Sequence, residues 1–345
     1  MSASLEVAAA GAGQAAAGTA RRAAIGRRAA TLLVRSASFI AFAAVLAVFA
    51  WQAPFFLSVA NVGNVLGQSA ILGTLAIGLT IVVIGGGSNV VTGGIDLSIA
   101  ANMGLSAAVY ASLIQAGADD GTAAAGALAT GLAIGLVNAL SVTLLGIVPL
   151  LATLAVMNVV AGLELVLTQN TVVPAATDFL SVLSGYGPWS VPVLAFVFVG
   201  IAAVFFIGVQ QTRIGLHLYA VGEFPEAARA AGLPVRRLVA GSYLVCGLTG
   251  GIGGILSVAY LSGSTTGSGE MLLSVVVTAL LGVVFSRRLV PTIGGTVLSA
   301  LFVGFLINGF QLLNISSYWV SGVQGVLILL VVAATSLLRR NGSAP

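Results

Sequence analysis

The chain has 345 residues, of which 59% are apolar and a further 45 are glycine, and its mean hydropathy is +1.13. Its 13 basic and 9 acidic residues make up only 6% of the chain and give a net charge of +4, whereas about a quarter of the residues of a soluble domain are charged. This composition excludes a soluble globular domain and a disordered protein, and it predicts a protein that crosses a membrane several times.

Residues 1–35 are rich in alanine and glycine and carry the first five arginines, which predicts a disordered cytoplasmic tail. A membrane-spanning helix needs about 20 mostly apolar residues. Ten segments are predicted as spans: 37–57, 65–85, 95–115, 123–146, 149–169, 189–209, 239–261, 271–286, 289–312 and 317–338. We therefore predict an all-α polytopic membrane domain over residues 36–340, followed by a cytoplasmic tail at 341–345.

The arginines fit these ten spans if both termini are cytoplasmic. Starting from a cytoplasmic N-terminus, every later arginine follows an even number of crossings. The later basic residues are Arg213, Arg229, Arg236, Arg237, Arg287, Arg288, Arg339 and Arg340. All 13 then lie on the cytoplasmic side, as the positive-inside rule requires. The positive net charge is therefore explained by membrane topology and does not indicate nucleic-acid binding.

Residue types that the chain lacks exclude several kinds of chemistry. All 13 basic residues are arginine, so there is no lysine for the phosphate-binding loop of an ATPase or for a Schiff base. His217 and Cys246 are the only residues of their kinds, which excludes an internal disulfide and a His/Cys zinc site. We expect a protein that is not an enzyme and that binds no metal or cofactor itself.

The break before the third span, Gly93–Ser98 (GGIDLS), places polar side chains at a helix start. Glycines interrupt the apolar sequence there, and membranes tolerate a broken helix only beside water or other protein. Asp96 is favoured at such a position as a cap or dipole partner. Two interpretations stay open: a structural cap near the inner interface, or a residue that lines or gates a transport pathway.

Glu164 is the one carboxylate predicted well inside an apolar span, and Gln169 follows it near the outer end. A buried carboxylate in a membrane usually faces a cavity or a polar partner. Further amides at or near membrane depth are Asn102, Asn138, Asn158, Asn308, Gln311 and Asn314. Amides donate and accept hydrogen bonds, as the hydroxyls of a neutral solute do. The candidate pathway residues are Asp96, Asn102, Asn158, Glu164, Gln169 and Asn308, with hydrogen bonding between helices as the alternative for each.

Small residues and aromatics are given structural roles. The pairs Gly131/Gly135 and Gly247/Gly251 have the spacing that permits close helix packing. Trp51, Trp189, Tyr318 and Trp319 fall near predicted outer ends of spans, as in an aromatic belt.

The cytoplasmic loop at 210–238 is the most informative polar segment. Pro225 can begin a short helix and Gly232 can end it. Glu223 and Glu226 lie near its N-terminal end and Arg229 lies later, which matches the helix dipole. Such a short helix needs a partner surface, either the protein's own loops or another subunit. The alternative is an ordinary charged connecting loop.

The loop sequence TRIGLHLYAVGEFPEAARAAGLPVRRL resembles the cytoplasmic loop of ABC sugar-importer permeases of the ribose/xylose/galactose type, the inner-membrane component of binding-protein-dependent transport systems. The matching residues are Gly222, Glu226, Ala227, Ala228, Arg229, Gly232 and Leu233. The GGIDLS segment and the span at 149–168 are also similar to that family, and the resemblance runs from about residue 37 to 340. The sequence departs from the family at Ser286–Arg288, where glycines are expected.

The resemblance implies a permease that moves a monosaccharide or sugar-like solute across the bacterial inner membrane. Its loop helix, with Glu223 beside the matching residues, would couple to a separate ATPase subunit that uses ATP and Mg²⁺. The other implied partners are an extracytoplasmic solute-binding protein, a second permease copy and membrane lipid. The alternatives are a permease for branched-chain amino acids or nucleosides, an ion-coupled secondary transporter, and a membrane scaffold that transports nothing.

Overall fold

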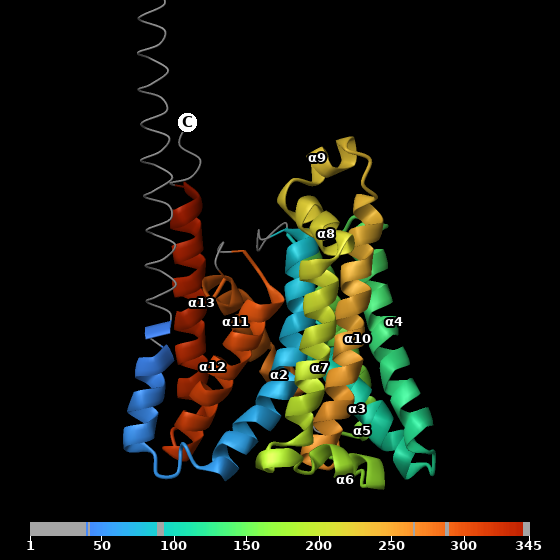
Figure 1. Ribbon diagram of the computed structural model, residues 1–345. Coiled ribbons are helices and arrows are strands. Elements are labelled where there is room, and N and C mark those ends of the chain that lie inside the picture. The colour runs from blue at the N-terminus through green and yellow to red at the C-terminus, as the bar shows by residue number, and fades with distance from the viewer. Residues whose placement is uncertain (1–38, 41, 88–92, 265, 287–289, 341–345) are drawn as a thin grey trace, which may run out of the picture.

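The computed structural model describes residues 39–40, 42–87, 93–264, 266–286 and 290–340 (Figure 1). The predicted tails at 1–35 and 341–345 lie outside the described residues, as do Arg287 and Arg288. Apart from two isolated β-bridges, the regular structure of the described residues is helical, which confirms the all-α prediction.

The helices follow one another along the chain as α2 (Val59–Gly86), α3 (Ile99–Gln115), α4 (Asp120–Thr143), α5 (Pro149–Thr168), α6 (Asp178–Ser184), η1 (Pro188–Ser190), α7 (Val193–Phe206), η2 (Ile207–Gln211), α8 (Arg213–Glu223), α9 (Pro225–Ala230), α10 (Val235–Leu261), η3 (Ser268–Glu270), α11 (Met271–Val284), α12 (Ile293–Leu312) and α13 (Ser317–Arg340). A further apolar helix at Phe42–Gln52 precedes α2.

Six helices of the described residues are long and apolar enough to cross a membrane: α2, α4, α5, α7 with its continuation η2, α10 and α12. The other four predicted spans coincide with shorter apolar helices at Phe42–Gln52, Ile99–Gln115, Ser268–Val284 and Tyr318–Leu330. The chain is therefore a multi-pass membrane protein, while the number of ten crossings stays a prediction.

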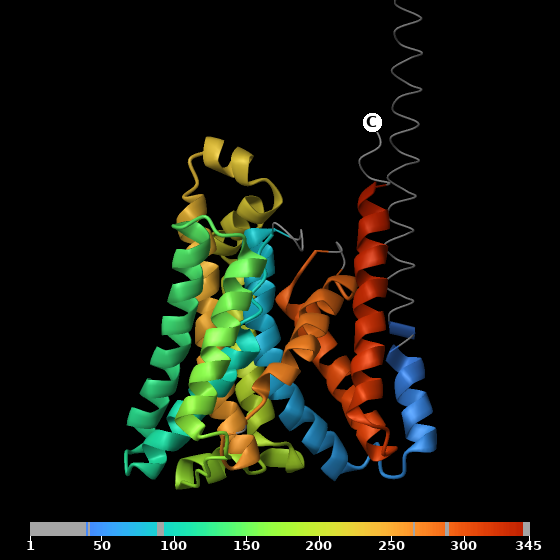
Figure 2. The ribbon, with the colours of Figure 1, turned by 180° about the vertical axis from the view of Figure 1, so that it is seen from behind.

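The helix α2 forms the centre of the bundle. In its most apolar stretch 94% of the residues are buried, against 22% for α5 and α7. A helix that is apolar all round is buried either by other helices or by lipid, and α2 is buried by other helices. Figure 2 shows α4 and α5 on the rear face of the molecule, where apolar side chains such as Val159 and Val166 stay exposed. The peripheral helices thus present the surface that lipid would cover.

Glycines bring α4 and α10 into backbone contact. A Cβ atom on Gly135 would lie 2.7 Å from the carbonyl oxygen of Tyr243, and one on Gly251 would lie 2.9 Å from that of Ala127. These distances leave no room for a side chain, so the predicted small-residue packing is confirmed.

The third span begins later than predicted. Its helix starts at Ile99 and not at residue 95, because the Asp96 side chain accepts a hydrogen bond from the backbone N–H of Ser98. That bond holds residues 95–98 in a turn outside the helix. The sequence analysis also missed α6, a single short helix between α5 and α7.

The two ends of the bundle differ in charge (Figure 1). The helices α8 and α9 project from one end, together with the first turn of α10, and carry the four arginines Arg213, Arg229, Arg236 and Arg237. At the opposite end lie the α3–α4 connection with Asp119 and the helix α6, which begins at Asp178.

Candidate coupling helix and transport cavity

The short helix predicted in the cytoplasmic loop is present as α9. Pro225 occupies its first position, where a missing backbone N–H costs nothing. Gly232 ends it with a positive φ of 82°, a conformation that glycine adopts without steric strain. The backbone N–H of Leu233 then donates to the carbonyl of Ala228 at 3.0 Å, which satisfies a carbonyl of the last turn.

Most of α9 faces outward. Ala228 is its one buried residue, while Glu226, Ala227 and Arg229 are exposed. Arg229 donates to Glu226 over 2.8 Å, and both side chains are more than half exposed. An ion pair this exposed adds little stability. Both groups therefore remain available to a partner.

Backbone contacts join the C-terminal end of α8 to the end of α2. A Cβ on Gly222 would overlap the carbonyl oxygen of Ile84, and one on Gly87 would lie 2.6 Å from the carbonyl oxygen of Gly222. Gly222, predicted as a coupling residue, thus lies in this contact, whereas Glu223 is exposed. No side chain separates the two backbones here, so α8 and α2 meet as rigid bodies.

Tyr219 adds a second connection between α8 and the helices. Its hydroxyl donates to the carbonyl oxygen of Pro291 at 2.7 Å, just before α12. Burial raises the pKa of Tyr219 to about 12, so the hydroxyl keeps its proton at physiological pH.

Asp96 lies fully buried between α3 and α4. Its carboxylate accepts from the hydroxyl of Ser98 at 2.6 Å and from the amide of Asn138 at 3.2 Å. These bonds tie the break before α3 to the neighbouring helix, which fits the structural interpretation of Asp96.

Two of the predicted pathway amides hold helices together. Asn102 donates to the carbonyl oxygens of Gly131 and Gly247, both at 3.3 Å, where α3, α4 and α10 meet. Asn308 of α12 and Asn61 of α2 exchange two amide hydrogen bonds of 2.8 and 3.0 Å.

The other two amides stay exposed in the described chain. Asn158 donates to the carbonyl of Leu154 within its own helix. Gln169 ends α5 in a left-handed conformation.

Glu164 is the buried carboxylate of α5. One of its oxygens accepts from the hydroxyl of Ser268 in η3 at 3.0 Å, and the other has no partner among the described residues. A Cβ on Gly104 of α3 would overlap this pair. The glycine thus makes room for a polar connection between α5 and η3.

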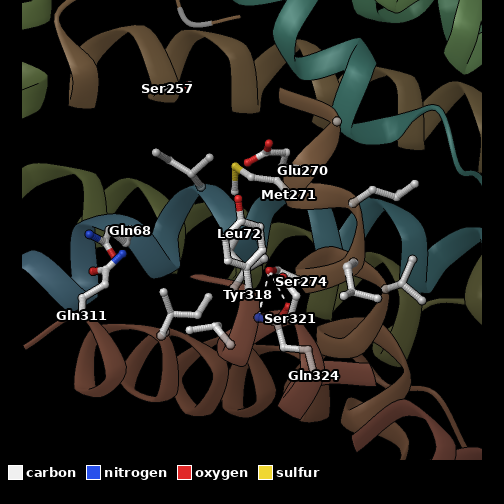
Figure 3. A pocket seen from close by; sticks show the side chains of 18 of the residues that line it. Gln68, Leu72, Ser257, Glu270, Met271, Ser274, Gln311, Tyr318, Ser321 and Gln324 are labelled. Carbon is white, nitrogen blue, oxygen red and sulfur yellow. Dashed lines mark hydrogen bonds between the residues drawn. The ribbon is translucent and has the colours of Figure 1, made fainter. Parts of the chain in front are cut away.

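A cavity of about 1040 Å³ lies between α2, α10, η3, α11, α12 and α13, in the half of the bundle away from α9 (Figures 1 and 3). Its polar lining residues are Gln68, Ser257, Tyr260, Glu270, Ser274, Gln311, Tyr318, Ser321 and Gln324. The volume is at the upper end of the range of about 300–1,000 Å³ for small-molecule sites. None of the six predicted pathway residues lines it.

Hydrogen-bonded pairs hold two of the cavity's glutamines. Gln68 of α2 donates to the hydroxyl of Tyr260 at 3.0 Å. Ser274 of α11 and Gln324 of α13 bond to each other at 3.0 and 3.2 Å, which Figure 3 marks with dashed lines. Sequence reasoning missed these four residues. A signal was present for Gln324, because it is a polar amide within the apolar span predicted at 317–338.

Comparison with known proteins identifies the family. The model of the family described as branched-chain amino acid transport system / permease component matches residues 61–332. The chain belongs to this family. It is therefore a transport component of the membrane and not an enzyme, as its composition predicted.

Curated relatives of this permease cover most of its length. It is 32% identical to the ribose import permease protein of Escherichia coli K12 over 300 residues, which are 85% of this chain and 90% of the relative. It is 28% identical to the galactose/methyl galactoside import permease protein of the same strain over 314 residues, 85% of this chain and 91% of the relative. It is 29% identical to an autoinducer 2 import system permease protein of Enterobacter sp. strain 638, over 77% of this chain and 81% of the relative. No solved structure gives a significant match to the chain.

Proposed function

We propose that this chain is the membrane permease of an ABC importer that carries a monosaccharide or a sugar-like solute into a bacterial cell. Its relatives are named as import permeases for ribose, for galactose and methyl galactoside, and for autoinducer 2, which supports this proposal. In this proposal the chain crosses the inner membrane ten times with both termini in the cytoplasm, which places the α8–α9 end inside.

The exposed helix α9 is the observation that carries the proposal. It stands at the end of the bundle that bears the described arginines, which the positive-inside rule assigns to the cytoplasm. Glu226, Ala227 and Arg229 face away from the rest of the chain and are open to another protein. A chain without lysine has no ATP-binding loop of its own, so a docked ATPase subunit that uses ATP and Mg²⁺ would supply the energy.

The central helix α2 would carry movement from that ATPase toward the solute. Its C-terminal end contacts Gly222 of α8, while its other half contributes Gln68 to the cavity. A displacement of α9 would therefore shift one wall of the cavity. ATP can change access in this way only if the ATPase binds the two conformations with different affinity.

The cavity favours a sugar over an amino acid. Among the described residues that line it, Glu270 is the only charged one, so the carboxylate of an amino acid would find no cation among them. Outside the membrane, a solute-binding protein would deliver the solute to the end that carries α6. A second copy of the permease would complete the transport unit.

Photo-crosslinking in native membranes tests this arrangement. A photoreactive residue in place of Ala227 in α9 is expected to capture an ATP-hydrolysing subunit. The matched control is Val182, which is exposed on α6 at the opposite end; a photoreactive residue there should capture no ATPase. The proposal is wrong if Ala227 captures none, or if an ion gradient drives solute uptake by the purified permease without any ATPase.

A further inference from the structure

We propose that the cavity between α2, α10, α11, α12 and α13 is a binding site for one neutral monosaccharide within each permease subunit, and that Gln68, Gln311 and Gln324 recognise its hydroxyl groups. This inference rests on the proposed function and adds the site and the recognising residues to it.

The lining has the hydrogen-bonding character of a polyhydroxylated solute. Nine of the 22 lining residues carry a hydroxyl, an amide or a carboxylate, and the three glutamines come from three different helices. Each amide offers both a donor and an acceptor, as each sugar hydroxyl does. The cavity therefore presents amides from α2, α12 and α13.

Two of the three glutamine side chains, those of Gln68 and Gln324, are held in place before any solute binds. The Gln68 and Gln324 amides each have a hydrogen-bond partner across the cavity wall, and Gln324 is only 3% exposed. Both amides keep a donor or acceptor position that these bonds do not use. Gln311 makes no side-chain hydrogen bond to another described residue. Pre-positioned groups reduce the entropy lost on binding.

Apolar residues complete the site. Ile71 and Leu72 of α2 and Met271 of α11 line the same cavity, and so does the exposed ring of Tyr318 (Figure 3). The C–H faces of a sugar ring can pack on such groups while the hydroxyls meet the amides.

Other occupants fit less well. A lipid acyl chain has nothing to offer the glutamine amides, and burying an amide without a partner is unfavourable. An anionic solute would meet Glu270 and no cation among the lining residues that the structure describes.

Cysteine protection tests the site in the whole permease. The chain's one cysteine, Cys246, is fully buried. A second cysteine, introduced by the substitution Ser321→Cys, can therefore be labelled selectively. Labelling of Ser321→Cys with a thiol reagent should be slowed by D-ribose or D-galactose. D-galacturonate, which adds a carboxylate, and a short-chain phospholipid should not slow it. The matched control is Gly322→Cys, the next residue on α13, which is exposed but does not line the cavity.

The sugar concentration that gives half-maximal protection provides the second measurement. In the Ser321→Cys permease, Gln68→Leu and Gln324→Leu are each expected to raise this concentration about tenfold, the effect of losing one or two hydrogen bonds of about 1 kcal/mol. Gln169→Leu removes an exposed glutamine that does not line the cavity and should leave it unchanged.

The outcomes separate the two proposals. If the unchanged permease takes up a monosaccharide but the sugar does not protect Ser321→Cys, or protects it equally well in the two leucine variants, the cavity is not the site and the proposed function stands. Protection by the phospholipid alone would make the cavity a lipid site. If the complete system takes up no monosaccharide, the proposed function and the binding site both fall.

Discussion

The two ends of the α2 helix are built in opposite ways. At the end near α8, backbone lies against backbone, because Gly87 and Gly222 leave no space for a side chain. At the other end, α2 contributes Gln68 to a cavity bordered by side chains from five further elements. Close backbone packing transmits displacement, whereas a cavity lined by amides can adapt to a solute. The same central helix thus joins a rigid contact to an adaptable one.

The largest effect is expected at the rigid end. In Gly222→Ala the new methyl group overlaps the carbonyl oxygen of Ile84, and neither backbone can move without displacing α2 or α8. Overpacking of this kind costs about 1–3 kcal/mol. We expect ATP-driven uptake to fall by a factor of about 5–150, the range that corresponds to this free energy.

The control is Gly241→Ala in α10, where a Cβ meets no atom within 4 Å. Uptake by that variant should match that of the unchanged chain. Normal uptake by Gly222→Ala would show that the contact between α2 and α8 is looser than its geometry indicates.

An intermediate effect is expected for Glu164, which does not line the cavity but contacts Ser268 in η3, one of the elements around it. Glu164→Leu removes the acceptor of the buried Ser268 hydroxyl and should lower the free energy of unfolding by about 1–3 kcal/mol. Glu164→Gln keeps an acceptor oxygen and should lower it less. Thermal unfolding of the purified permease in detergent measures both variants. Equal losses for the two would mean that shape and not the hydrogen bond holds η3 against α5.

The smallest effect is expected at Asp119, in the exposed connection before α4. Hydrogen bonds from the hydroxyl and the backbone N–H of Thr122 lower the pKa of this carboxyl. Its charged form therefore stabilises the fold above the unfolded-state pKa of about 3.9, and this stabilisation is lost as the pH falls through the lower folded-state pKa.

Asparagine caps a helix about as well as aspartate but does not titrate. In Asp119→Asn, the melting temperature should therefore decrease less between about pH 5 and pH 3 than in the unchanged chain. Melting curves across this range provide the test, and identical decreases in the two proteins would contradict it.

The membrane class, the helices of the core and α9 could be predicted because they depend on local pattern. Apolar stretches of about 20 residues predict spans wherever they occur, and Pro225 and Gly232 mark a helix by their backbone preferences alone. The same local reasoning singled out Asp96, Asn102 and Asn308 as polar residues at membrane depth. It left open whether they face a solute or another helix, because that depends on which helices are neighbours.

The sequence by itself determined that this chain is a multi-pass all-α membrane protein with a short exposed helix in an arginine-bearing loop. Only the tertiary structure decided that Asn102 and Asn308 join helices, and that Gln68, Ser274 and Gln324 surround one cavity. These residues lie up to 256 positions apart in the chain. Helix packing brings them together, and that packing depends on the shapes of whole helix surfaces, which no local pattern records.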